Sequence, residues 1–170
     1  MAKLQLTDAE IDQMRAQDTR LVSDFQAIQL EINAKKHWDL FYKRNESRFF
    51  KDRHWTTREF EELLDAGHVG RILLEVGCGV GNLIYPLLED NIEFGKIYAC
   101  DLSPRAIEFV KNHKLYNVEK IKAFQTDVTV EGCFVEVDQP VDIITLIFVL
   151  SAIHPEKFKR FVKFYLTKYL

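Results

Sequence analysis

The stretch of residues 71–82 constrains the fold of this chain more than any other. Its first half, residues 71–76, is a short apolar run rich in branched side chains, as expected for a buried parallel strand. Three glycines then alternate with other residues: Gly77, Gly79 and Gly81. Because glycine has no Cβ and tolerates a positive φ, this backbone can turn sharply and let a ligand lie close. A helix beginning near Asn82 would point its free N–H groups at the same ligand, so the stretch predicts a nucleotide-type pocket.

The spacing of the glycines separates two kinds of nucleotide pocket. A dinucleotide fingerprint requires Gly-x-Gly-x-x-Gly, but the sixth position counted from Gly77 is Asn82. This disfavours a nicotinamide-dependent dehydrogenase, which stays an alternative. The pattern Glu75-x-Gly77-x-Gly79-x-Gly81 resembles the first motif of the S-adenosylmethionine-dependent methyltransferases that have a Rossmann-like sheet.

A second strand that ends in an acid supports a nucleotide ligand. Residues 96–100 form a mainly apolar run that leads to Asp101, twenty residues after Gly81. A carboxylate at this place can accept two hydrogen bonds from ribose hydroxyls. The alternative is that Asp101 stabilises the N-terminus of a helix, because Ser103-Pro104 is a sound helix start. Both roles can hold together.

The rest of the chain alternates between predicted strands and helices. After the glycine turn, we expect a helix over 82–89, a strand over 96–100, a helix from 103 to about 113, strands over 121–124 and 141–149, and a last helix from 155. The strand over 141–149 is mainly apolar and is therefore predicted to be central. This alternation indicates a doubly wound α/β sheet with ligands at the carboxyl ends of its strands.

Helices are also predicted ahead of the sheet. Thr7-x-x-Glu10 and Ser23-x-x-Gln26 match the capping box, and apolar residues recur after them at helical spacing. We expect one or two helices over residues 7–45. A short helix capped by Thr56 is expected to run through residue 64 and to end at residues 65–67.

Residues 42–58 interleave basic and aromatic side chains. The basic residues are Lys43, Arg44, Arg48, Lys51, Arg53 and Arg58, and the aromatic ones are Tyr42, Phe49, Phe50 and Trp55. Phosphate contacts use such charges, and stacking on unpaired bases uses such rings, so the segment is a candidate RNA-binding surface. A solvated loop with inward-packed rings is the alternative, and the sequence leaves it open.

Composition excludes several classes of protein. The 170 residues make one domain by length, and 47% hydrophobic content suffices for a packed core. The net charge of −3 predicts no nucleic-acid partner by itself. Cys78, Cys100 and Cys133 are scattered and the histidines have no ligand spacing, which argues against a metal site and a disulfide framework and for a reducing compartment. The polar, acidic N-terminus is no targeting peptide, and the longest apolar run, residues 143–153, is too short to span a membrane.

Five stretches of the sequence together match one family. They are residues 38–45, 49–60, 75–82, 100–108 and 146–155, and the match extends over nearly all of residues 20–168. They resemble the transfer-RNA N3-methylcytidine methyltransferases, the methyltransferase-like proteins of eukaryotes. The resemblance implies a methyltransferase that uses S-adenosylmethionine to form N3-methylcytidine in the anticodon loop of tRNA. The short acidic N-terminus is most similar to that of the cytosolic member acting on serine tRNA, which implies serine tRNA as substrate, seryl-tRNA synthetase as a partner, and the cytoplasm, with the nucleus as a further location.

The resemblance also implies which residues hold the cofactor. Gly77 and Gly79 would line its methionine and ribose side, and Asp101 would hold the ribose hydroxyls. Asp127, just past the third strand, would accept a hydrogen bond from the adenine amino group. Val128 would supply a neighbouring backbone contact.

Three further contacts come from other elements. Ile147 in the fourth strand would border the methionine part of the cofactor. Because the N-terminal arm of the family folds over the cofactor, Trp38 and Tyr42 are expected to touch it. No catalytic residue is assigned, since N3 of cytosine has a free lone pair at neutral pH and needs no general base.

The chain departs from the family at its C-terminus. The family continues past the helix at 155–168 with a Pro-Gly turn, a fifth strand and a closing antiparallel pair, whereas this chain stops at Leu170. We therefore expect a helical arm over residues 1–66 and, over 67–170, a partial class I methyltransferase sheet of four strands with an exposed apolar edge. The hypothesis is a truncated isoform or incomplete gene model that binds cofactor weakly at best. The alternative function is a catalytically silent cofactor- or RNA-binding fragment that acts through a partner.

Overall fold

The computed structural model describes residues 6–19, 21–64 and 70–158. The chain divides into two compact units, residues 1–34 and 35–170. The boundary at residue 66 between an arm and a cofactor domain stays a prediction.

Two capped helices make up the described part of the first unit. They are α1 (Asp8–Asp18) and α2 (Asp24–Ile32), and neither buries a residue. Thr7 Oγ1 accepts a hydrogen bond from Glu10 N at 3.4 Å, and Glu10 Oε2 accepts one from Thr7 N at 2.7 Å. Ser23 and Gln26 make the same reciprocal pair, so both capping boxes are confirmed. No helix among the described residues has the length and apolarity that a membrane span needs.

Residues 7–45 form three helices, so the expectation of one or two is wrong. The third helix is α3 (Ala34–Asn45). Asn33 separates it from α2, because both its backbone N–H, at 3.1 Å, and its side-chain Nδ2, at 2.9 Å, donate to the carbonyl of Gln29. Asparagine side chains compete in this way with helical hydrogen bonds and end helices.

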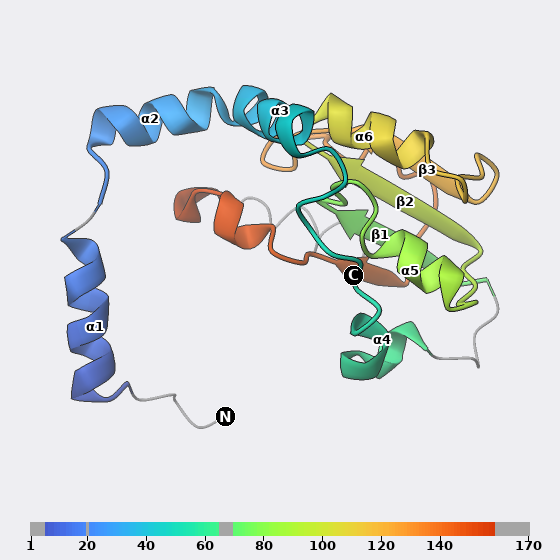
Figure 1. The fold of residues 1–170 in the computed structure, drawn as a ribbon, viewed down its shortest axis with the longest axis horizontal. Helices are drawn as coiled ribbons and strands as arrows, with labels where there is room; N and C mark the ends of the chain where they lie inside the picture. Colours follow the sequence, from blue (N-terminus) through green and yellow to red (C-terminus); the bar gives the residue numbers. More distant parts are fainter. Residues whose placement is uncertain (1–5, 20, 65–69, 159–170) are drawn as a thin grey trace. The chain divides into compact units, whose positions relative to one another are not determined.

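A parallel four-stranded sheet forms the centre of the second unit (Figure 1). Its strands are β1 (Ile72–Val76), β2 (Lys96–Asp101), β3 (Ile121–Gln125) and β4 (Ile143–Thr145), in the order β3-β2-β1-β4. This confirms the predicted Rossmann-like α/β fold class. The chain runs outward from β1 to β3 and then returns to the other side of β1. The carboxyl ends of β1 and β4 therefore flank a topological switch point, where open α/β sheets bind ligands.

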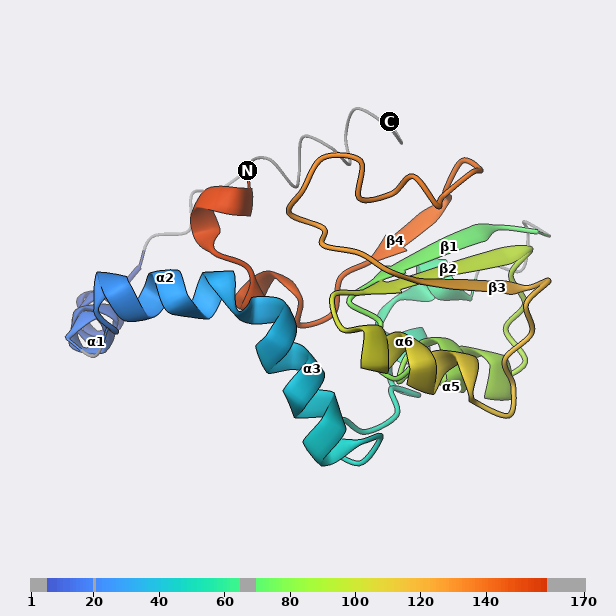
Figure 2. The ribbon, with the colours of Figure 1, turned by 90° about the horizontal axis from the view of Figure 1, so that it is seen from above.

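Apolar side chains cover both faces of the sheet. One face packs against α5 (Ile84–Glu89) and α6 (Pro104–Lys111), which lie on the same side of the sheet (Figure 2). The other face packs against the segment after β3, which contributes Phe134 and Val137 to the buried core. Because both faces are covered, the strands read as apolar runs rather than as an alternating pattern.

The fourth strand is shorter than predicted and is not central among the described residues. β4 covers only 143–145 of the expected 141–149, and the only described strand that pairs with it is β1. Phe148 has a φ of 61° and is 72% exposed. A non-glycine residue in this left-handed region cannot continue a strand, so the apolar run turns away from the sheet and enters the short helix η2 (Leu150–Ala152).

The expected cap of the short helix before the sheet is also wrong. The helix α4 (Thr56–Glu59) is preceded by Trp55 as its N-cap residue, and η1 (Glu61–Leu63) follows it. Thr56 Oγ1 instead donates to the carbonyl of Arg53 at 2.8 Å. The expected end at residues 65–67 lies outside the described residues. Of the last predicted helix, residues 155–158 are helical and the rest also lies outside them.

The start of α6 joins this helix to α3. Ser103 Oγ accepts from Ala106 N at 3.3 Å and Pro104 is the first helical residue, as predicted. Asp39 of α3 accepts two further hydrogen bonds at the same helix end, from Ser103 Oγ at 2.9 Å and from Arg105 N at 3.2 Å. A carboxylate at a helix N-terminus is favourable, so α3 is fixed beside the carboxyl end of β2 (Figure 1).

Replacing Ser103 with alanine should lower the free energy of unfolding by about 1–2 kcal/mol, because the buried hydroxyl both caps α6 and donates to Asp39. Urea unfolding followed by tryptophan fluorescence measures the change. Thr7→Ala is the matched control: it removes a capping hydroxyl from α1, which buries nothing, and should change the value by less than about 0.5 kcal/mol. Equal effects of the two substitutions would contradict the role given to Ser103.

Candidate functional site

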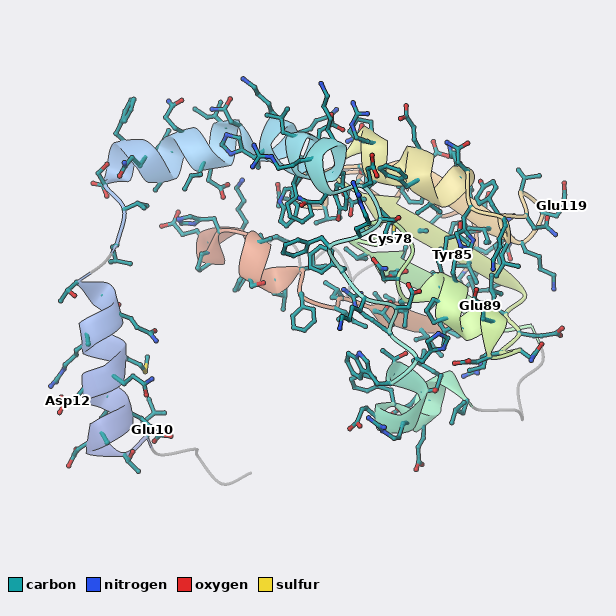
Figure 3. The ribbon with its side chains drawn as sticks, viewed as in Figure 1. Glu10, Asp12, Cys78, Tyr85, Glu89 and Glu119 are labelled. Atoms are coloured by element: carbon teal, nitrogen blue, oxygen red, sulfur yellow. The ribbon has the colours of Figure 1, made fainter. Side chains whose placement is uncertain are left out.

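The loop between β1 and α5 needs glycine at each of its three glycine positions. Gly77, Gly79 and Gly81 have φ values of 67°, 56° and 94°. A Cβ built on Gly77 would lie 2.4 Å from Val149 Cγ2, and one on Gly79 would lie 3.0 Å from the Tyr42 hydroxyl. The loop is thus a close-packed cradle of backbone at the carboxyl end of β1. In the stick view Cys78 lies in this loop, and Tyr85 and Glu89 lie on α5, the helix that follows it (Figure 3).

Asp101 connects the glycine loop to the start of α6. It closes β2 and is 8% exposed. Its Oδ2 accepts from Gly79 N at 3.0 Å and its Oδ1 from Ser103 N at 2.9 Å. Burial raises the pKa of Asp101, against the lowering effect of the backbone N–H groups of Ser103 and Gly79. Each carboxylate oxygen can accept a second hydrogen bond, so Asp101 retains acceptor capacity toward a ligand.

Glu75 is a buried acid with an unused oxygen. The side chain is on the face covered by α5 and α6 and the residue is 1% exposed. Glu75 Oε1 lies 3.9 Å from Arg53 Nη1, while Oε2 has no hydrogen-bond partner among the described residues. Burial raises the pKa of Glu75 to about 8, in spite of the nearby Arg53 charge. Thr145 pairs with Glu75 across β1 and β4, and its buried Oγ1 is likewise without a partner in the described structure.

The register partners Glu75 and Thr145 each have a buried polar atom without a partner in the described structure, and this marks a place where a ligand can be held. Buried polar groups are almost always hydrogen-bonded in proteins, so each such exception requires an explanation. Of the four such atoms among the described residues, the two of Glu75 and Thr145 lie on the strands that flank the switch point of the sheet. The Glu75 carboxyl and the Thr145 hydroxyl suit a polar or cationic ligand, because a cation would favour the ionised form of Glu75.

α3 brings an aromatic cluster to the glycine loop. Tyr42 is 4% exposed and packs with Val80 and Ala106. The Trp38 ring is half-buried in the same cluster, 6.3 Å from the Tyr42 ring centroid. Burial, with the negative charge of Asp101 as a second cause, raises the pKa of Tyr42. Both residues therefore lie at the edge of the sheet that carries the loop.

The remaining predicted site residues lie at the ends of β3 and β4. Thr126 N donates to the carbonyl of Asp101 at 2.9 Å, which places Asp127 at the strand end next to Asp101. Asp127 Oδ1 accepts from Thr129 N at 2.8 Å and from Thr129 Oγ1 at 2.7 Å. Val128 packs on the face of the sheet opposite α5, whereas Ile147 packs on the α5 face.

The structure thus brings together Tyr42, Gly79 and Asp101 and places Gly77 beside them in the same loop. Val128 and Ile147 flank the edge on opposite faces of the sheet. That all eight residues contact a cofactor stays a prediction. Among the described residues, no cluster of three histidine, cysteine or acidic side chains could hold a metal ion.

The basic-aromatic segment, residues 42–58, has features of both an RNA-binding surface and a solvated loop with inward-packed rings. The rings of Phe41, Phe49 and Phe50 pack edge to face or tilted with centroids 4.9–5.8 Å apart. Phe49 nevertheless stays 58% exposed and Trp55 38% exposed. The basic side chains of the segment are exposed with one exception: Lys43, Arg44, Arg48, Lys51 and Arg58 face solvent, and Arg53 is buried.

Three residues of the site make contacts that the sequence analysis does not predict. Asp39, Arg53 and Asn82 all act through contacts with residues far along the chain. Asn82 was informative only as the residue that breaks a dinucleotide fingerprint. Its place in the first turn after the glycines was the available signal, since a polar residue there lies close to the site.

Comparisons with known proteins agree with this geometry. A family model described as a methyltransferase domain matches residues 74–166, more than half of the chain. The tRNA N(3)-cytidine methyltransferase METTL6 of Mus musculus is 52% identical over 158 residues, which are 91% of this chain and 56% of the relative. The tRNA N(3)-methylcytidine methyltransferase trm141 of Schizosaccharomyces pombe is 51% identical over 145 residues, 84% of this chain and 58% of the relative. The chain therefore spans little more than half the length of these relatives.

Solved structures share the fold. The glycopeptide N-methyltransferase MtfA, in a complex with S-adenosyl-L-methionine, aligns with a TM-score of 0.53 at 17% identity, over 72% of this chain and 51% of its own. The methyltransferase domain of the bacterial protein CtHen1-CN aligns with a TM-score of 0.52 at 22% identity, over 65% and 57%. At these identities the likeness supports the class I methyltransferase fold.

Gly77→Ala should destabilise the protein by about 2 kcal/mol or more, since it adds a clash with Val149 to the strain of a positive φ. Gly132→Ala is the control, because Gly132 also has a positive φ but nothing lies within 4 Å of its built Cβ. It should cost only about 1 kcal/mol of strain. Urea unfolding measures both. A Gly77→Ala protein no less stable than the Gly132→Ala protein would show that the loop is not close-packed.

The raised pKa of Glu75 predicts a pH dependence of stability. Between the ordinary value of 4.5 and the folded value of about 8, the folded state binds one more proton than the unfolded state. The free energy of unfolding must then fall as the pH rises through this window, by at most about 1.4 kcal/mol per pH unit. Glu75→Gln cannot titrate and should flatten the profile, as measured by urea unfolding from about pH 5 to about pH 8. The exposed control Glu119→Gln should keep the wild-type slope, and a Glu75→Gln profile of unchanged slope would contradict the assignment.

Proposed function

Since this chain belongs to the methyltransferase-domain family, in the group of the tRNA N(3)-cytidine methyltransferases, we propose that it comes from an enzyme that methylates N3 of a cytidine in the anticodon loop of tRNA. The methyl donor we propose is S-adenosylmethionine. The observation that carries the proposal is the convergence of a glycine loop and acidic side chains at the carboxyl edge of the sheet, in a chain of this family.

The charge of this edge favours a cationic nucleoside over a nucleotide phosphate. Glu75 is the penultimate residue of β1, Asp101 ends β2, and Asp127 follows β3, so the three acids belong to neighbouring strands. Ionised acids next to the loop would repel a pyrophosphate, whereas S-adenosylmethionine has a sulfonium and an ammonium group, whose positive charge would lower the raised pKa of Glu75. The unpartnered Glu75 Oε2 and the glycine backbone are features of this site that fit such a ligand.

Each predicted site residue has a proposed role. Asp101 holds the ribose hydroxyls through the acceptor capacity that its two backbone N–H contacts leave. Asp127 accepts from the adenine amino group, beside the backbone of Val128. Gly77 and Gly79 approach the methionine and ribose side.

The other three residues border the same ligand. Ile147 lies beside the methionine part, and Trp38 and Tyr42 contribute aromatic surface from α3. Because Tyr42 lies against Gly79, it is positioned to close the site on the side of α3.

The chemistry leaves the protein mainly with placement. The cofactor supplies a methyl group on a sulfonium sulfur, already activated for transfer. The N3 lone pair of cytosine forms the new C–N bond while the methyl–sulfur bond breaks, and the sulfur keeps the electron pair. Holding the two reactants in line can contribute about 7 kcal/mol or more, so we assign no catalytic residue.

The exposed part of residues 42–58 is the proposed RNA surface. Lys43 and Lys51 are exposed and can approach phosphates, as can Arg48 once it leaves its surface ion pair with Glu46, and the exposed rings of Phe49 and Trp55 can stack on unpaired bases. An anticodon loop provides such bases, which an enzyme that reacts at N3 requires.

We further propose serine tRNA as the substrate and seryl-tRNA synthetase as an assisting partner. This rests on the resemblance of the N-terminal segment to the cytosolic, serine-specific member of the family. The proposed location is the cytoplasm, with the nucleus as a second one. The buried thiols of Cys78, Cys100 and Cys133 are compatible with a reducing compartment.

Calorimetry with S-adenosylhomocysteine and mass spectrometry of nucleosides test the proposal. We expect the chain to bind S-adenosylhomocysteine and, with unmodified tRNA and S-adenosylmethionine, to yield N3-methylcytidine. Asp101→Asn should weaken binding about tenfold or more, because hydrogen bonds to a charged group contribute about 1.5–3 kcal/mol each. The exposed control Asp12→Asn should bind as the wild type does.

Two outcomes would change the conclusion. Absence of binding by a folded wild-type chain, shown by its thermal melt, would refute the cofactor assignment. Binding without turnover would favour the second candidate, a catalytically silent cofactor- or RNA-binding fragment that acts through a partner.

A further inference from the structure

Asn82 fastens the basic-aromatic segment to the end of the glycine loop. Asn82 is 6% exposed. Its side-chain Nδ2 donates to the carbonyl of Phe50 at 3.2 Å and to Asp52 Oδ1 at 3.0 Å. Its own carbonyl accepts from Arg53 N at 2.8 Å. Both amide hydrogens and the backbone carbonyl of one residue thus hold residues 50–53.

The side chain of Arg53 reaches the other end of the same loop. Its guanidinium is buried, with Nη1 3.9 Å from Glu75 Oε1 at the end of β1. It also lies 5.7 Å from the ring centroid of Phe148, in the turn after β4. The loop that contains Gly77 and Gly79 is therefore held at both of its ends, Glu75 and Asn82, by one short segment.

We propose that Asn82 is a positioning residue that couples the cofactor site to the RNA surface, so that an S-adenosyl nucleoside and RNA each increase the affinity for the other. This inference rests on the proposed function and deepens it. The Asn82 contacts to Phe50, Asp52 and Arg53 are called the Asn82 clasp below. No residue of the clasp has to touch either ligand for the coupling to occur.

The clasp has a buried side and an exposed side. Its buried side is formed by Asn82 and the Arg53 guanidinium. On the exposed side, Phe49, Lys51 and Trp55 face solvent from the same stretch of backbone. A ligand that fixes the glycine loop therefore also restricts the backbone that presents these side chains, and binding free energies coupled in this way are reciprocal.

The aromatic cluster adds a second connection. Phe49 and Phe50 pack against Phe41 of α3, and the Phe41 ring lies 5.2 Å from that of Tyr42. Tyr42 in turn lies against Gly79. The segment is thus connected to the loop through Asn82, through the Arg53–Glu75 pair and through α3, and a substitution at position 82 interrupts only the side-chain contacts of Asn82.

The test compares RNA binding with and without the nucleoside in the 170-residue chain. Fluorescence anisotropy measures the Kd for a short RNA stem-loop with cytidines in its loop, alone and with saturating S-adenosylhomocysteine. In the wild type we expect the nucleoside to tighten RNA binding by about fivefold or more, within the usual range of about 5- to 150-fold. The ratio of the Kd without the nucleoside to the Kd with it should fall in Asn82→Ala to about half of the wild-type value or less, since the backbone contact of Arg53 and the connection through α3 remain. Asn112→Ala, an exposed asparagine at the end of α6, should keep the wild-type ratio.

A charge swap separates coupling from a loss of stability. Asn82→Asp alone places its carboxylate opposite that of Asp52 and should lower the Kd ratio at least as much as Asn82→Ala does. Combining it with Asp52→Asn restores one hydrogen bond with its direction reversed and should regain part of the ratio. A purely structural role would lower the melting temperature of Asn82→Ala and leave the ratio unchanged, which would overturn the inference.

The failures of the two proposals can be told apart. If the wild type binds both ligands but the nucleoside leaves the Kd for RNA unchanged, a Kd ratio of about one, the coupling is refuted and the proposed function stands. If the folded wild type binds neither ligand, both are refuted. If Asn82→Ala keeps the wild-type ratio, Asn82 is not the coupling residue.

Discussion

The rest of the site depends on the two hydrogen bonds that the Asp101 carboxylate accepts from backbone N–H groups. One carboxylate oxygen accepts from Gly79 N and the other from Ser103 N, so one side chain fixes the turns after β1 and after β2. Gly79 can offer its N–H there only because its φ of 56° is accessible to glycine. Ser103 then begins α6 and receives Asp39 of α3, which carries Tyr42 toward the loop. The placement of three elements thus follows from one buried acid.

The burial of Asp101 and Glu75 also sets the electrostatic character of the carboxyl edge of the sheet. A low local dielectric makes an ionised carboxylate costly, and this is why the pKa values of Glu75 and Asp101 are raised. A ligand that brings positive charge reduces this cost, whereas an anionic ligand increases it. The proposed preference for a cationic nucleoside therefore rests on how deeply the acids are buried and not only on how many there are.

Sequence reasoning succeeded where the signal is local. The glycine loop, the cap at Ser103 and the capping boxes of α1 and α2 depend on residues within a few positions of each other, and the structure confirms them. The fourth strand failed because apolarity alone does not show where a backbone leaves a sheet, and Phe148 does so with a positive φ. Thr56 failed as a cap because its hydroxyl donates to Arg53. Asp39 and Asn82 contact partners 64 and 30 residues away, and no local pattern encodes such pairs.

The absence of buried residues in α1 and α2 has a thermodynamic consequence. Helices of 11 and 9 residues are shorter than the length at which isolated helices become stable in water, and these two gain nothing from a core of their own. Their capping boxes favour the helical conformers, but a helix–coil equilibrium remains. Any partner that covers Phe25 and Ile28, both more than half exposed, would shift this equilibrium and bear the entropic cost of ordering the chain. Recognition through this region would then be weaker than its contact area suggests and easily reversed.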